Sequence, residues 1–130
     1  MFGEKPIFGQ NEITIDNNGR MFVPANTKRE EGEELVLLYN ENLKLYEMYS
    51  VEKLKIRFEE LENLVLNAKN KKEKVFYEKM ILELSKSILK NGKVDSQGRF
   101  SIGIVFEPHE KLLSTGAYDH LIIERGKSKK

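Results

Sequence analysis

The pentapeptide DNNGR at residues 16–20 recurs as DSQGR at residues 95–99, so that Asp95 follows Asp16 by 79 residues. Each copy comes after a residue favoured in strands and comes before an apolar-rich run. Aspartate can accept hydrogen bonds from backbone N–H groups two or so residues further on, and glycine takes positive φ without steric cost. We therefore predict two similar tight turns, and a chain that uses one small β unit twice.

The pattern of apolar residues outlines the rest of each unit. The first unit is expected to hold strands at 13–15 and 21–23, a short helical turn at 24–29, and a hairpin formed by residues 35–39 and 43–46. The second unit is expected to hold an apolar-rich run at 100–106 and a hairpin formed by residues 114–117 and 121–123. The hairpins lie at nearly the same distance from their turns, which favours a repeat over coincidence.

The stretch between the two units has helical periodicity. Ser50 stands where a helix N-cap is expected, and apolar residues then recur at spacings of three and four, which predicts helices at about 51–66 and 71–90. Asn91 and Gly92 are expected to close the second helix as a left-handed cap. The predicted fold class is α+β, with a first unit at residues 1–50, a helical hairpin insert at 51–91 and a second unit with a basic tail at 92–130.

Composition narrows the class of protein. The 130 residues include no cysteine, so disulfides and thiolate metal ligands are excluded. No apolar run approaches the roughly 20 residues that span a bilayer, so we expect a soluble, cytoplasmic protein without a membrane partner. The net charge is only +1, so any anion-binding face must be local. The tail at 126–130 is basic and is expected to add loose attraction to a polyanion.

These residues resemble the MraZ family of bacterial transcriptional regulators over nearly the whole chain. The resemblance rests on the two Asp-x-x-Gly-Arg motifs, the Met1-Phe2 start, the Val23-Pro24 step, the turn at 28–30 and the helical middle of about 40 residues. It implies two SpoVT-AbrB-type swapped-hairpin units that form an intrachain pseudo-dimer. It also implies a nucleoid-associated repressor that binds short repeated boxes upstream of the division and cell-wall gene cluster, as a ring of more than two subunits.

The second half departs from the family pattern. The family usually has proline after the second apolar run, whereas here Gly103 follows Ile102. Residues 107–109 read Glu-Pro-His in the region where the family has a helix carrying an arginine, and Pro108 restricts any helix there to starting near it. We therefore expect the second half to contribute less to DNA contact than the first.

The candidate site residues are basic groups at and near the turns. Arg20 and Arg99 are the predicted base-reading groups, because a guanidinium beside a tight turn can bind guanine or phosphate with its planar fork. Lys28 and Arg29 are the predicted phosphate contacts. The turns themselves are expected to be formed by Asp16, Gly19, Asp95 and Gly98. The alternative is that the arginines pair with their own aspartates and only fix the turns, and the two roles can coexist.

Other kinds of site find little support in the sequence. Asn17 and Asn18 lack the spacing of an EF-hand calcium loop, and His109 and His120 stand in no metal-binding context, so we interpret both histidines as surface or turn residues. No acid/base pair, P-loop or Ser/His/Asp arrangement is recognisable, so neither an enzyme, a cofactor, a metal nor a small-molecule substrate is expected. Two alternatives stay open: an antitoxin-like regulator of another operon, and a degenerate AbrB-like oligomeric protein without specific DNA binding.

Overall fold

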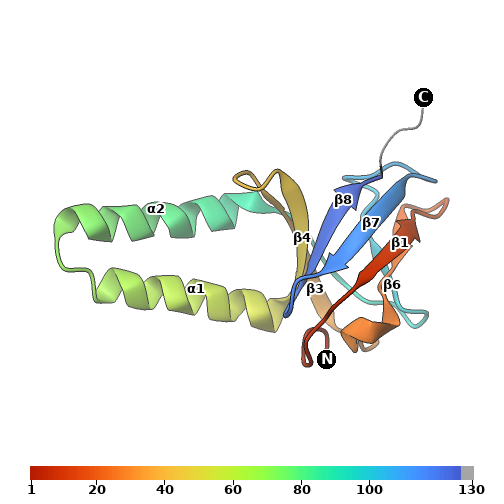
Figure 1. Cartoon of the computed structure of the whole chain (residues 1–130), viewed down its shortest axis with the longest axis horizontal. Coiled ribbons are helices and arrows are strands. Elements are labelled where there is room, and N and C mark those ends of the chain that lie inside the picture. The colour runs from red at the N-terminus through yellow and green to blue at the C-terminus, as the bar shows by residue number, and fades with distance from the viewer. Residues whose placement is uncertain (127–130) are drawn as a thin grey trace.

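The computed structural model describes residues 1–126 and has an α+β fold. A six-stranded antiparallel sheet, a two-stranded ribbon and a hairpin of two helices make up the chain (Figure 1). The elements in chain order are β1 (Gln10–Thr14), β2 (Arg20–Phe22), the 3-10 turn η1 (Ala25–Thr27), β3 (Glu34–Asn40), β4 (Leu45–Ser50), α1 (Val51–Leu66), α2 (Lys71–Ser87), β5 (Ile88–Lys93), β6 (Arg99–Ser101), β7 (Lys111–Gly116) and β8 (Leu121–Arg125). The expected fold class, short 3-10 turn and two hairpins are therefore present.

The strand order links the two halves of the chain. The large sheet runs β1-β7-β8-β4-β3-β5, so the hairpins β3–β4 and β7–β8 meet at its centre along β4 and β8. β1 pairs with β7 of the second half, and β5 pairs with β3 of the first half. The small ribbon joins β2 to β6, again one strand from each half. Each half thus completes its hydrogen bonding with strands from the other.

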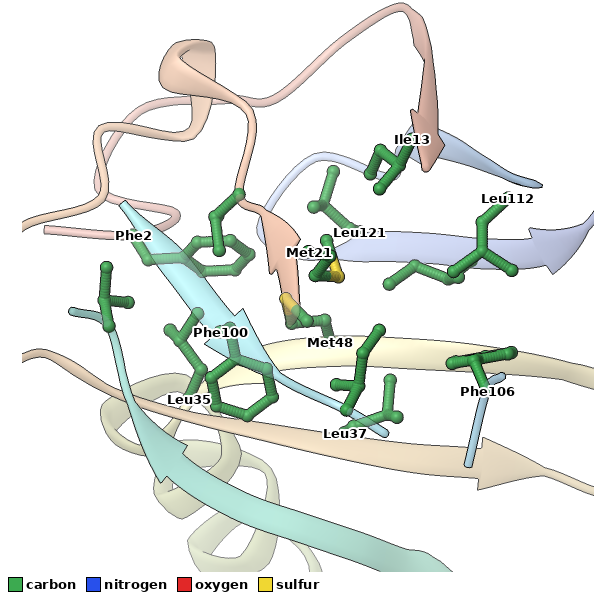
Figure 2. Packing of buried hydrophobic residues seen from close by; sticks show 14 of the residues in the cluster. Phe2, Ile13, Met21, Leu35, Leu37, Met48, Phe100, Phe106, Leu112 and Leu121 are labelled. Carbon is green, nitrogen blue, oxygen red and sulfur yellow. The ribbon is translucent and has the colours of Figure 1, made fainter. Parts of the chain in front are cut away.

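The main core lies between the ribbon and the sheet. Figure 2 shows Met21 of β2 and Phe100 of β6 pointing into a cluster that includes Leu35 and Leu37 of β3 and Met48 of β4. All five side chains are fully buried. Burying a side chain of this size stabilises a fold by roughly 1.5–3 kcal/mol, so the ribbon is fixed to the sheet by its inner face.

Strand β3 is buried on both faces, which explains its uninterrupted apolar sequence. Leu35 and Leu37 face the main core, whereas Val36 and Leu38 form a second cluster with Leu54 of α1. Successive side chains of a strand point to opposite faces, so each pair belongs to a different layer. The second cluster covers the base of the helical hairpin.

The first helix begins and ends where the sequence predicts, and the second helix begins where the sequence predicts. The Ser50 hydroxyl accepts a hydrogen bond from the Lys53 N–H at 3.1 Å, and the Asn70 side chain accepts one from the Glu73 N–H at 2.8 Å. Each cap satisfies one of the free donors at the start of a helix. Beyond the base, the hairpin extends away from the sheet as an arm (Figure 1). No residue of α2 is buried, and Leu54 is the one buried residue of α1.

The end of the second helix was predicted wrongly. α2 ends at Ser87, and Asn91 and Gly92 lie inside β5, where they pair with Val36 and Leu35 and do not form a helix cap. A Cβ on Gly92 would lie 3.1 Å from a ring atom of Phe100, so glycine here permits close packing of the ribbon. The expected boundary between residues 91 and 92 falls within this strand.

Smaller differences concern the strand ends. The second strand of the first hairpin begins at Leu45, because Leu43 and Lys44 belong to the turn and Lys44 has φ of 57°. The run at 100–106 is a strand only as far as Ser101, and no helix forms between residues 102 and 110. Among the described residues, no helix is both long and apolar enough to cross a membrane. The basic tail at 127–130 lies outside the described residues.

Candidate nucleic-acid interface

The first Asp-x-x-Gly-Arg turn is held by its own aspartate. Asp16 Oδ1 accepts hydrogen bonds from the backbone N–H groups of Asn18 and Arg20, both at 2.9 Å, and Oδ2 accepts one from Arg20 Nε at 3.1 Å. Gly19 has φ of 76° and donates its N–H to the Asp16 carbonyl. The backbone N–H of Arg20 is the main cause that lowers the pKa of Asp16, so the carboxylate is ionised at neutral pH.

The second turn repeats this geometry. Asp95 Oδ1 accepts from the N–H groups of Gln97 at 2.9 Å and Arg99 at 2.8 Å, and Oδ2 accepts from Arg99 Nε at 2.9 Å. Gly98 has φ of 79°. The backbone N–H of Arg99 again lowers the pKa of the aspartate. In both copies the aspartate therefore accepts hydrogen bonds from the same three equivalent donors.

The ribbon brings the two turns side by side. Met21 pairs with Phe100 at its centre, and each flanking arginine faces a residue of the opposite strand. The Val23 N–H donates to the Gly98 carbonyl at 2.9 Å, and the Ile102 N–H donates to the Gly19 carbonyl at 2.8 Å. The glycine of each turn thus accepts a hydrogen bond from the residue that follows the ribbon strand of the other copy.

The outer face of the ribbon carries the arginines. Because Met21 and Phe100 point into the core, alternation places Arg20, Phe22, Arg99 and Ser101 on the opposite face. The side chain of Arg20 is 30% exposed and that of Arg99 is 19% exposed, while Phe22 is 57% exposed. Within residues 1–126 the two terminal nitrogens of each guanidinium make no hydrogen bond, since only Nε contacts the aspartate. We call these four residues the ribbon face.

The two other predicted basic residues occupy different environments. Lys28 ends the 3-10 turn in a left-handed conformation with φ of 63° and has an exposed side chain. Arg29 is partly buried, and its guanidinium lies against Gly98, so that a Cβ on that glycine would lie 2.5 Å from Nε and Nη2. The structure therefore brings Arg29 of the first half to the turn of the second half, where no pattern in the sequence placed it.

A shallow depression adjoins the first turn. It encloses about 390 Å³ and is lined in part by Asn17, Asn18, Lys90 and Ser101. Lys90 comes from β5 and was not among the predicted site residues, because the sequence placed it in a helix. It adds a positive charge beside the Asp16–Arg20 turn.

A second duplicated feature lies in the turns at 30–33 and 107–110. The Glu30 N–H donates to Glu33 Oε1 at 3.2 Å, and the Glu107 N–H donates to Glu110 Oε1 at 3.1 Å. The residues before the second glutamates, Gly32 and His109, both have positive φ. The predictions from the sequence did not include these turns, and the repeated Glu-x-x-Glu spacing is the signal that could have found them.

Both histidines were predicted to be surface or turn residues; both lie in turns, but only His109 of the two is at the surface. His109 is an exposed turn residue, but His120 is only 8% exposed and lies between two carboxylates. Its Nε2 is 3.0 Å from Glu47 Oε2 and its Nδ1 is 2.8 Å from Asp119 Oδ1. The ring stacks on Tyr49 with centroids 4.3 Å apart. The described residues contain no group of three or more potential ligands suited to a metal ion.

No protein-family model matches the chain, and comparison with curated proteins gives no match either.

Proposed function

We propose that this protein is a sequence-specific DNA-binding transcriptional regulator of the repressor type. The observation that carries the proposal is the pair of matched Asp-x-x-Gly-Arg turns joined by one ribbon, which puts two guanidinium groups on the same exposed face. The motifs resemble those of the MraZ family, and this resemblance makes repeated boxes upstream of the division and cell-wall gene cluster the expected operator. The protein is then a nucleoid-associated, non-enzymatic component of the cytoplasm.

The ribbon face has the size and chemistry for major-groove contact. A two-stranded ribbon fits the major groove, where an arginine can bind guanine O6 and N7 with two donors. Each aspartate takes the Nε of its arginine and leaves the terminal nitrogens for a base. Phe22 lies between them with an exposed ring that suits contact with a thymine methyl group.

The two units together form, in this proposal, a swapped-hairpin pseudo-dimer within one chain. The exchange of β1 and β5 between the hairpins supports it, as does the equal hydrogen bonding of the two turns. The Met21–Phe100 pair would lie on the pseudo-two-fold axis, because these residues are equivalent in the repeat. Such a chain presents its arginines to DNA as a symmetric dimer presents those of its two subunits.

The helical arm is the proposed contact with further copies of the chain. Leu64, Phe76 and Leu82 are each more than 40% exposed on the arm, and apolar surface of this kind commonly marks an interface. The acidic Glu59, Glu60 and Glu62 of α1 and the basic Lys71, Lys72 and Lys74 of α2 both lie toward the tip of the arm. In this proposal the arms of neighbouring copies pack side by side, and the opposite charges of α1 and α2 attract one another. A homo-oligomer larger than a dimer would then bind repeated boxes with a high effective concentration.

A second function has one observation in its favour. Arg20 and Arg99 are each bonded to an aspartate, and the net charge is near zero, which suits an oligomeric interaction protein without specific DNA binding. Such a protein would assemble but would show no salt-dependent affinity for its upstream region.

The test is a titration of folded variants against a duplex from the chain's own upstream region at several salt concentrations. Arg20→Ala should weaken specific binding by about 1–3 kcal/mol and blur sequence preference, because a bidentate arginine–guanine pair is lost. Lys28→Ala should weaken all DNA equally and reduce the salt slope by about one unit. Lys55→Ala on α1 is the matched control and should bind as wild type does. Wild-type binding by Arg20→Ala would assign that residue to the turn alone.

A further inference from the structure

Arg29 makes the two turns unequal. At the first turn, the nearest atoms to a Cβ on Gly19 belong to the backbone of Gly103, a residue with no side chain. At the second turn, the nearest atoms to a Cβ on Gly98 belong to the Arg29 guanidinium. The second turn is therefore flanked by the guanidinium of Arg29 as well as that of Arg99, whereas the atoms nearest to a Cβ on Gly19 belong to a glycine backbone.

The hydrogen bonding of Arg29 is incomplete. Its Nε is buried and has no partner, and neither terminal nitrogen makes a hydrogen bond among the described residues. The buried Nε cannot be reached from outside, so an external acceptor would be bound by the two terminal nitrogens, which are unpaired within residues 1–126 and are not among the buried atoms. Among the described residues no carboxylate accepts a hydrogen bond from Arg29; Glu33 accepts the Phe2 N–H at 2.7 and 2.9 Å and the Glu30 N–H.

The Arg29 guanidinium lies against Gly98, the residue that precedes Arg99, and the acceptors that guanidinium groups bind most strongly are anionic oxygens. Phosphate offers several oxygens and binds arginine through two parallel hydrogen bonds. Asp95 already occupies Nε of Arg99, and it leaves that arginine with its terminal nitrogens available. The second turn thus combines the positive charges of Arg29 and Arg99 with the carboxylate of Asp95.

We propose that Arg29 and Arg99, one from each half of the chain, form a composite phosphate-binding site over the Gly98 turn. This inference rests on the proposed function for its biological ligand, which is a backbone phosphate of the DNA. It reverses the expectation from the sequence that the second half contributes less. The two turns then bind their half-sites unequally, with the stronger backbone contact at the second turn.

The first experiment needs no DNA. The wild-type protein, Arg29→Gln and Arg20→Gln are melted with increasing inorganic phosphate, with KCl adjusted to hold the ionic strength constant. Phosphate bound only to the folded state raises the Tm by mass action. The rise should be present in wild type and Arg20→Gln and absent in Arg29→Gln. An equal rise in wild type and Arg29→Gln, or no rise in wild type, overturns the site. The quantity compared between variants is the phosphate-dependent rise in Tm. A change in packing caused by the substitution alters the Tm without phosphate and is therefore subtracted.

The second experiment measures coupling on duplex DNA from the upstream region. Arg29→Gln and Arg99→Gln should each weaken binding about tenfold, as expected for one charged hydrogen-bonded contact. Because they share one phosphate, the double variant should fall well short of a hundredfold loss. Arg29→Gln combined with Arg20→Gln should show the full product. Equal additivity of both pairs overturns the composite site.

The two proposals fail in different ways. If wild type binds phosphate in the melting experiment but no DNA, the proposed function is wrong and the anion site stands. If wild type binds its upstream DNA specifically while Arg29→Gln binds both ligands as wild type does, the regulator stands and this inference is wrong. The Arg29→Lys variant separates charge from the guanidinium fork, and it should regain only part of the phosphate effect.

Discussion

Replacing His120 by phenylalanine should destabilise the fold strongly, although the ring would still stack on Tyr49. The change removes the hydrogen-bonding partner of Glu47 Oε2, whose distance to His120 Nε2 is 3.0 Å. Removing the donor from a buried, hydrogen-bonded carboxylate costs about 1–3 kcal/mol. Glu47 keeps a long hydrogen bond to the Asn40 side chain at 3.3 Å, so a loss of about 2 kcal/mol is expected.

A double-mutant cycle isolates this interaction. Glu47→Leu should also destabilise, because it leaves the imidazole with one carboxylate, but Glu47→Leu combined with His120→Phe should recover much of the loss, since no buried charge remains unpaired. The free energies of unfolding are measured in urea at pH 7 and at one protein concentration, because assembly adds to apparent stability. If the two single losses sum to that of the double variant within about 0.5 kcal/mol, the two residues do not interact and the reasoning is wrong.

Four further results are expected. Burial acts to raise the pKa of Glu47, but the hydrogen bond and charge of His120 outweigh it and hold the pKa below the usual 4.5. The ionised Glu47 therefore stabilises the fold above pH 4.5, and this stabilisation should be lost as the pH falls through the lowered pKa. Urea midpoints measured from pH 7 to 3 should accordingly fall less steeply in Glu47→Gln than in the wild type. Met21→Ala should cost about 2–5 kcal/mol in the same assay, because it leaves a cavity under the ribbon. Gly19→Ala should cost about 1–3 kcal/mol, since φ is 76° and its Cβ would lie 2.7 Å from the Gly103 Cα. Phe76→Glu should keep the circular dichroism spectrum but reduce the mass seen by light scattering; an unchanged mass would remove the arm from the interface.

The sequence was most informative where one residue type is required by local chemistry. The two Asp-x-x-Gly-Arg turns follow from an aspartate that caps backbone N–H groups and a glycine that takes positive φ. Ser50 likewise marks the start of α1 through its own hydrogen bond. The turns and the helix cap depend on residues that are close together in the sequence, so they can be predicted from the sequence alone.

Features that depend on distant partners could not be found in this way. Ile88 and Leu89 continue the helical period of α2, but pairing of β5 with β3 outweighs that local preference, and the Asn91-Gly92 signal is used in a strand. His120 meets Glu47 only because β4 and β8 are adjacent. The approach of Arg29 to Gly98 needs the crossing of the two halves at the ribbon. No spacing along the chain encodes these contacts.

The exchange of edge strands affects how the chain folds during synthesis and how it responds to proteolysis. Ile13 cannot find its partner Leu112 until 99 further residues have been synthesised, so neither half can complete its sheet while the ribosome still holds the other. Long-range pairings of this kind slow folding, because the loop between them must close before the contacts form. The same interlocking protects the finished molecule: a protease that cuts the loop at 67–70, at the tip of the arm, would leave two fragments held together by the sheet and the ribbon.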